Sequence, residues 1–103
     1  MAYQVILAPR AFQDLENVVR YIALDSPVMA ERFGKLLIEK VRSAGDFPWS
    51  GRVVPEFQDP RIREVIVKSY RIVYRVNEDA KTVEIARFWH AARGIPGLAE
   101  GEE

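Results

Sequence analysis

The sequence predicts an α+β fold in which a helical hairpin packs on a small, mainly antiparallel sheet, with elements in the order β-α-α-β-β-β. Two neighbouring stretches in the first half carry apolar residues at helical spacing, and a link of about three residues joins them. Segments rich in β-forming residues lie before and after this pair. A link this short requires antiparallel helices, so the two stretches form a hairpin.

The chain length and composition indicate one globular domain. The 103 residues are 49% hydrophobic and 29% charged, which excludes a disordered chain. We assign the domain to residues 1–93. Residues 94–103 contain three glutamates and no lysine or arginine, so we expect an acidic C-terminal tail that is loosely ordered unless a partner holds it.

The first strand is predicted at Tyr3–Leu7, where β-forming residues end before Pro9. Proline suits the first turn of a helix, so the first helix should begin at Pro9 and end near Leu24. Its apolar stripe consists of Phe12, Leu15, Val18, Val19 and Ile22.

The second helix is predicted to begin with Ser26 as its N-cap and Pro27 in its first turn. Gly45 is a typical helix stop, so we expect the helix to end there. Its apolar stripe consists of Ala30, Phe33, Leu37, Val41 and Ala44.

Residues 45–61 contain three prolines and two glycines, which predict an irregular connector. Three strands should follow, at Arg63–Lys68, Tyr70–Val76 and Thr82–His90. The first of them is apolar on both faces, which predicts a central strand. In the last strand the alternation blurs from residue 87 onward, which indicates a bulge or the strand's end.

One face of the sheet has no predicted helix to cover it. Tyr70–Val76 would place Arg71, Val73 and Arg75 on that face. A partly apolar and partly cationic open face predicts a binding surface, although solvated strand charges would give the same pattern.

The composition also limits the chemistry. There is no cysteine, which excludes disulfides, cysteine-bound zinc, iron–sulfur clusters and thiol catalysis. The single histidine, His90, leaves no histidine pair for a metal, so we expect neither metal nor cofactor. The apolar run near the start is too short for a signal sequence or a membrane span, and we expect a cytoplasmic protein without membrane contact.

Four segments together resemble the ParE branch of the ParE/RelE toxin superfamily of bacterial toxin–antitoxin systems. They are VILAPRAFQDLENVVRYI, FPWSGRVVPEF, YRIVYRV and ARFWHAARGIPGL, and the likeness spans residues 3–98. The resemblance implies the same fold that the element order predicts. It also implies a partner, a cognate ParD-like antitoxin that wraps the toxin with its C-terminal segment.

Two targets are compatible with this superfamily. ParE-like toxins inhibit DNA gyrase, and this is the expected function, with no direct DNA binding by the toxin alone. The formal net charge of zero fits a protein target better than a ribosomal one, because phosphate contacts dominate affinity for RNA. RelE-like relatives instead cleave messenger RNA on the ribosome, and a relative that only binds a partner remains the third alternative.

The ribonuclease alternative assigns Glu56 as general base, Arg71 as the phosphate-binding cation and His90 as a third participant. The pattern favours Glu56 as a loop carboxylate that pairs with Arg52 or Arg61 over a general base, and it favours His90 as a structural residue that bonds loop backbone. The strand ends Trp89-His90 where the ribonuclease branch has His-Tyr, so a tyrosine is absent and the histidine is displaced by one residue. A shift of one residue turns a strand side chain to the opposite face.

The gyrase reading places target contacts at the basic C-terminal end. Residues 61–93 contain eight Lys or Arg against four Asp or Glu. The predicted target-binding residues are Arg71, Arg75, Arg87, His90 and Arg93.

Overall fold

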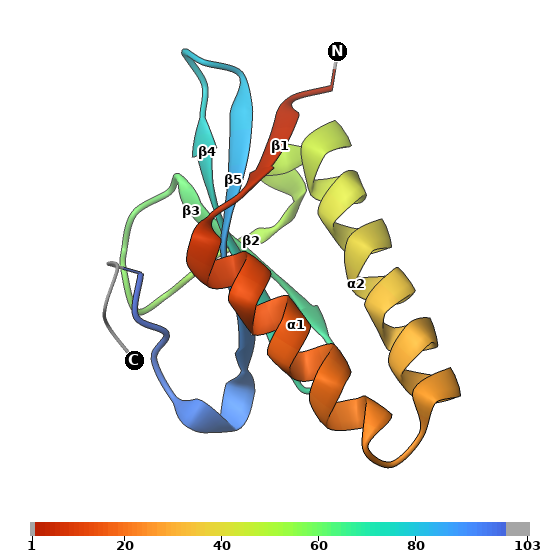
Figure 1. The fold of residues 1–103 in the computed structure, drawn as a ribbon. Coiled ribbons are helices and arrows are strands. Elements are labelled where there is room, and N and C mark those ends of the chain that lie inside the picture. The colour runs from red at the N-terminus through yellow and green to blue at the C-terminus, as the bar shows by residue number, and fades with distance from the viewer. Residues whose placement is uncertain (1, 99–103) are drawn as a thin grey trace.

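The computed structural model describes residues 2–98 and confirms the predicted fold (Figure 1). Two helices pack against a five-stranded sheet with the strand order β1-β5-β4-β3-β2. Strands β1 and β5 are parallel, and the other neighbouring strands are antiparallel. The elements are β1 (Gln4–Leu7), α1 (Pro9–Ala23), α2 (Pro27–Asp46), η1 (Pro48–Ser50), β2 (Arg52–Val53), β3 (Ile62–Val67), β4 (Tyr70–Asn77), β5 (Thr82–His90) and η2 (Ala91–Arg93).

The helix starts follow the local signals in the sequence. Pro9 and Pro27 each occupy the first turn of their helix. Ser26 caps α2, because its hydroxyl oxygen accepts a hydrogen bond from the Met29 amide at 3.2 Å. The link between the two helices is therefore residues 24–26, as the hairpin requires.

Gly45 has a different role from the predicted helix stop. Helix α2 continues through Gly45 to Asp46. A Cβ atom at position 45 would lie 2.6 Å from Val5 Cγ2, and the Gly45 carbonyl accepts a hydrogen bond from the Tyr3 amide at 2.9 Å. The glycine thus allows α2 to approach the first strand closely, which is a tertiary requirement that the local sequence does not reveal.

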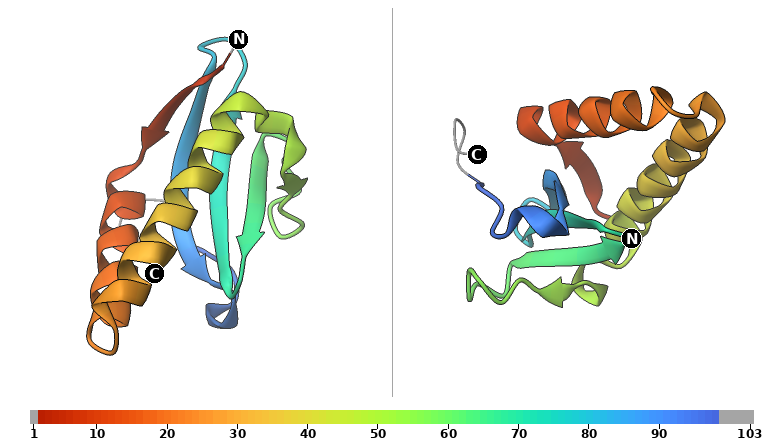
Figure 2. Two further views of the ribbon diagram at one scale, coloured as in Figure 1. Left: turned by 90° about the vertical axis from the view of Figure 1, so that its right-hand side faces the viewer. Right: turned by 90° about the horizontal axis from the view of Figure 1, so that it is seen from below.

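Both helices lie on the same side of the sheet (Figure 2). Most of the predicted apolar stripes and the facing strand residues form the main core, which includes the fully buried Leu37 and Tyr74. Phe12 and Val19 lie outside this core, and Phe12 is 55% exposed, so their assignment to the buried stripe is wrong. None of the helices in residues 2–98 contains a stretch long and apolar enough to cross a membrane. Other buried members of this core are Val18, Val41, Ile72, Val76, Val83, Ile85 and Phe88.

The opposite face of the sheet is covered, and the prediction of an open half-cationic face is wrong. Val73 is buried in a second apolar cluster with Val54 and Ile62, against which Phe57 and Leu98 pack. Arg71 is buried as well, and of the predicted face only Arg75 is exposed. Loops cover this face instead of helices.

The C-terminal segment contributes to this cover. Pro96 and Gly97 are buried, and Leu98 packs on the second cluster. Residues 96–98 are therefore packed against the domain, whereas Ile95 before them is 61% exposed. The rest of the predicted acidic tail, residues 99–103, lies outside the described residues.

The strand positions correct one prediction and confirm another. The central strand is β4, whereas β3 lies beside the two-residue edge strand β2, and Ile66 on β3 is half exposed. The blurred alternation in β5 is a bulge at Ala86, since Val73 pairs with Arg87 and Tyr74 pairs with Ile85. The extra residue allows Ile85 and Phe88 to join the same core.

Candidate functional site

The strongest cluster of charges lies on the loop-covered face and centres on Arg71. The Arg71 guanidinium donates to both carboxylate oxygens of Glu56, at 3.0 and 2.9 Å, and through Nε to Glu64 at 2.6 Å. Arg71 is 7% exposed and Glu64 1% exposed. The other Glu64 oxygen accepts a hydrogen bond from Arg52, which stands directly opposite in the β2–β3 register. The cluster is therefore an alternating network of two arginines and two glutamates.

Glu56 does not pair with either predicted arginine. Arg61 is paired with Asp59, and Arg52 with Glu64. The hydrogen bond from Arg71 lowers the pKa of Glu56 below the ordinary value of 4.5. A carboxylate held ionised by an arginine is a weak proton acceptor, which makes it a poor general base.

Arg87 is the second buried arginine of this face. It is 3% exposed, and it donates to both oxygens of Asp14 at 2.7 and 3.0 Å. It also donates to the Gly97 carbonyl at 2.8 Å. Asp14 additionally accepts a hydrogen bond from the Phe88 amide at 3.1 Å. Arg87 thus joins helix α1, strand β5 and the C-terminal segment.

Trp89 lies between two guanidinium groups. Those of Arg87 and Arg93 are 4.6 and 3.9 Å from its ring centroid. The indole nitrogen donates to the Gly94 carbonyl at 3.1 Å, and the same carbonyl accepts from Arg71 at 3.3 Å. Arg93 therefore packs on a buried ring while remaining at the surface.

His90 points to the helix side of the sheet. Its ring meets Tyr70 edge to face, with ring centroids 5.0 Å apart. Nδ1 accepts a hydrogen bond from the Ala92 amide at 3.1 Å, which starts the short helix η2. His90 thus bonds loop backbone, as one of the two sequence readings expects.

The structure brings only part of the predicted sites together. In the ribonuclease set, Glu56 and Arg71 meet, whereas His90 lies on the other side of the sheet. In the target-binding set, Arg75, His90 and Arg93 reach the surface. Arg71 and Arg87 are buried and paired, so their prediction as accessible target contacts is wrong for the described structure. Carboxylates distant in sequence neutralise them, and spacing alone does not reveal such partners.

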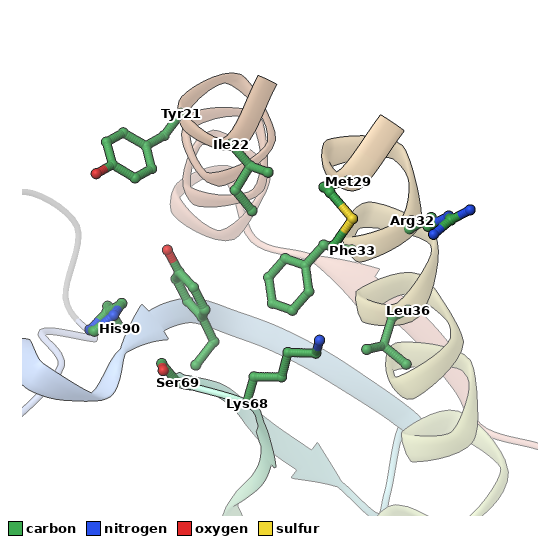
Figure 3. A pocket seen from close by; sticks show the side chains of 10 residues that line it. Tyr21, Ile22, Met29, Arg32, Phe33, Leu36, Lys68, Ser69 and His90 are labelled. Carbon is green, nitrogen blue, oxygen red and sulfur yellow. The ribbon is translucent and has the colours of Figure 1, made fainter. Parts of the chain in front are cut away.

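Sequence reasoning missed the main pocket of the described residues, which opens between the tip of the helical hairpin and the ends of β3, β4 and β5 (Figure 3). Its volume is about 620 Å³. It is lined by Tyr21, Ile22, Met29, Arg32, Phe33, Leu36, Lys68, Ser69, Tyr70 and His90.

The pocket wall is aromatic and apolar. The rings of Phe33 and Tyr70 are 5.6 Å apart, and His90 continues this series. Burial raises the pKa of Tyr70, so its hydroxyl stays neutral at physiological pH. The available sequence signal was Tyr21, an aromatic residue beside Ile22 but outside the first apolar stripe. Its side chain remains 73% exposed at the pocket mouth.

Within residues 2–98, no three Asp, Glu or His side chains gather in a way that could hold a metal ion. The arrangement offers instead two kinds of surface. One is the surface at the end of β5 and at η2, with His90 and Arg93, and the other is an apolar pocket without a carboxylate in its wall.

Comparison with known proteins gives a family and a fold. The model of the "ParE toxin of type II toxin-antitoxin system, parDE" matches residues 5–95. No match was found among curated protein sequences.

Solved structures with the same fold come from two toxin groups. A chain of the chromosomal ParDE system of P. aeruginosa superposes with a TM-score of 0.70 at 20% identity, over 86% of this chain and 96% of that one. A chain of the RelBE2 complex of Mycobacterium tuberculosis gives 0.66 at 20% identity, over 87% and 99%. A mutant of E. coli RelE in the free state gives 0.65 at 20% identity, over 91% and 88%.

Proposed function

The chain belongs to the ParE toxin family of type II toxin–antitoxin systems, and on that premise we propose that it inhibits DNA gyrase and is neutralised by a cognate ParD-like antitoxin. The observation that carries the choice of target is the pairing of Arg71. Its guanidinium is engaged by two carboxylates and a backbone carbonyl, so it has little capacity left for a scissile phosphate.

Metal-independent RNA cleavage requires a base, a cation that stabilises the phosphorane and an acid. Here the candidate base and the candidate cation neutralise each other, and His90 lies across the sheet from both. The neutral net charge adds to this argument, because binding to an RNA-rich target depends on uncompensated cations. Both arguments favour a protein target over messenger RNA.

The proposed gyrase contact is the C-terminal end of β5 and the following η2, at His90 and Arg93. Arg75 is a separate exposed candidate farther along β4, where it pairs with Glu84. Arginine makes planar, paired hydrogen bonds to carboxylates that lysine cannot reproduce. Each lost contact should cost roughly 1–3 kcal/mol of target affinity. We propose that the toxin acts in the cytoplasm, with gyrase as its partner and without DNA contacts of its own.

Purified gyrase tests this proposal directly. The wild-type protein should inhibit supercoiling, and Arg93→Ala should inhibit it less at equal concentration. A melting curve should accompany each variant, because Arg93 also packs on Trp89. In cells, induction should trigger the DNA damage response. Rapid translation arrest with codon-phased messenger cuts would instead establish the ribonuclease alternative.

The antitoxin is proposed to bind through a C-terminal segment that folds on the toxin. Such a wrapping segment should bury more than the standard ~1,600 Å² of a docked interface. Growth assays with and without the product of the adjacent gene separate this from the third alternative. A chain that leaves growth unchanged in both cases would be a binding relative without toxicity.

A further inference from the structure

We infer that Trp89 is a positioning residue for the proposed gyrase contact, and that its buried ring holds the Arg93 guanidinium in one orientation at the surface. This inference rests on the proposed function, because it concerns how a residue of the proposed contact is presented to gyrase. It is carried by the juxtaposition of a buried indole, 2% exposed, with an exposed arginine over its ring.

The first step is the contact between Arg93 and the ring. The guanidinium carbon of Arg93 lies 3.9 Å from the centroid of Trp89, well within the distance of about 6 Å over which a cation is attracted to an aromatic face. It is the shortest cation–π distance within residues 2–98. Stacking occupies the face of a guanidinium and not its N–H edge, so a stacked arginine can still pair with a carboxylate.

The second step is that the ring itself is fixed. The indole nitrogen of Trp89 donates to the Gly94 carbonyl at 3.1 Å, and Arg71 donates to the same carbonyl at 3.3 Å. The guanidinium of Arg87, which is held by Asp14, lies 4.6 Å from the ring centroid. The ring therefore cannot turn without breaking a hydrogen bond and disturbing a buried ion pair.

The third step is that the backbone of Arg93 is fixed at both ends of η2. At its start, Nδ1 of His90 accepts a hydrogen bond from the Ala92 amide at 3.1 Å. At its end, Gly94 has a φ of 86°, which suits glycine, and its carbonyl is anchored by Trp89. Backbone and guanidinium are thus both held before a partner arrives. An arginine ordered in advance loses less conformational entropy on binding, which strengthens the complex.

The other tryptophan of the chain provides the comparison. The guanidinium of Arg63 lies 5.0 Å from the Trp49 ring centroid. Arg63 also donates to three backbone carbonyls of the connector, at 2.7, 3.2 and 3.0 Å. That guanidinium therefore serves the fold, whereas Arg93 is presented at the surface. The same substitution at Trp49 and at Trp89 should have different effects on gyrase.

Supercoiling by purified gyrase provides the functional test. Trp89→Leu removes the aromatic face and should raise the toxin concentration for half-inhibition about fivefold. Trp89→Phe restores an aromatic face and should return that concentration to within about twofold of the wild type. Trp49→Leu is the matched control and should also stay within about twofold. Circular dichroism melts establish which variants are folded at the assay temperature.

A double-mutant cycle separates positioning from a general loss of structure. If the ring acts through Arg93, Trp89→Leu should cause no further loss of inhibition when it is added to Arg93→Ala. Losses that multiply in the double variant would show that Trp89 acts independently of Arg93. That result would overturn the inference.

Nuclear magnetic resonance measures the stacking without gyrase. In the wild-type protein the side-chain protons of Arg93, identified by their absence from Arg93→Ala, should be shifted upfield by the ring current of Trp89. The shift should remain in Trp89→Phe and disappear in Trp89→Leu. Arg93 protons without an upfield shift in the wild type would overturn the inference, even where Trp89→Leu does not fold.

The outcomes distinguish this inference from the proposed function. A wild-type protein that does not inhibit gyrase would overturn the proposed function, and the role of Trp89 with it. Inhibition by the wild type that Arg93→Ala leaves unchanged would overturn the role of Trp89 while gyrase inhibition stands. Weaker inhibition by Arg93→Ala with wild-type inhibition by a folded Trp89→Leu would retain the Arg93 contact and overturn its positioning by the ring.

Discussion

The two faces of the sheet are buried in opposite ways. The helix side is an apolar core that opens at the hairpin-tip pocket. The loop side buries Arg71, Arg87 and Glu64 in hydrogen-bonded ion pairs beneath the connector and residues 94–98. Two of the four arginines predicted from the sequence to bind the target, Arg71 and Arg87, are thus buried in ion pairs. The exposed pocket that could accept a ligand is instead lined mainly by apolar and aromatic side chains.

This difference has a physical origin. A buried arginine needs carboxylates and carbonyls around it, because an unpaired charge in the interior is costly. The Arg71–Glu56 pair therefore fixes the connector, and the Arg87–Asp14 pair fixes helix α1, against the sheet, and both guanidinium groups have little capacity left for a ligand. Exposed apolar side chains have the opposite property, since burial by a partner stabilises the complex.

The largest expected effect on stability comes from Asp14→Ala. Among the described residues it would leave the buried Arg87 guanidinium without a carboxylate partner, and the Gly97 carbonyl would be its remaining hydrogen-bond acceptor. We expect the free energy of unfolding to fall by roughly 3–5 kcal/mol, measured by urea denaturation. The matched control is Glu84→Ala in the exposed Arg75–Glu84 pair, with an expected loss of about 0–1 kcal/mol. Equal losses of unfolding free energy in the two variants would mean that burial does not make the Arg87–Asp14 pair more important than the exposed Arg75–Glu84 pair.

The next largest effect on stability is expected from adding a methyl group at Gly51, with Gly34 as the control. A Cβ atom at Gly51 would clash with the Tyr74 hydroxyl and lie 2.9 Å from the Glu64 carbonyl oxygen. Gly51→Ala should therefore destabilise the protein by about 1–3 kcal/mol. At Gly34 the added atom would lie 3.4 Å from Val19, so Gly34→Ala should be neutral or stabilise α2 by up to about 1 kcal/mol. Thermal melts of the two variants test this prediction. A lower melting temperature for Gly34→Ala than for Gly51→Ala would contradict the packing argument.

A smaller effect is the pH dependence of the Glu56–Arg71 pair. The pKa of Glu56 is lowered by Arg71, so its ionised form stabilises the fold above the ordinary value of 4.5. That contribution should be lost as the pH falls through the lowered pKa. Wild type and Glu56→Gln should therefore differ in stability at pH 7 and converge in acid. A difference that grows below pH 4.5 would have the wrong sign.

The smallest stability effect is expected at the pocket mouth. Tyr21 is 73% exposed, so Tyr21→Ala should change the free energy of unfolding by no more than about 0.5 kcal/mol. Urea denaturation measures this difference. A loss above about 1 kcal/mol would show that the ring contributes to the core despite its exposure.

The sequence alone determined both long helices, four of the five strands and their order, because local signals act over a few residues. It did not predict the short strand β2 (Arg52–Val53) or η1 within the connector, because β2 is defined by its pairing with β3. Ser26 and Pro27 mark the start of α2, and the blurred alternation in β5 marks the bulge at Ala86. The four motifs likewise indicated the family that the family model matches. These features depend on capping, periodicity and spacing, which can be read along the chain.

Only the tertiary structure decided which side chains are available. Arg87 meets Asp14 from a helix far away in sequence, and Glu56 reaches Arg71 from the connector. The hairpin-tip pocket likewise combines residues from both helices and three strand ends. Burial and charge pairing arise from contacts between distant segments. The sequence could therefore name the arginines but could not tell which of them hold the fold together and which face a partner.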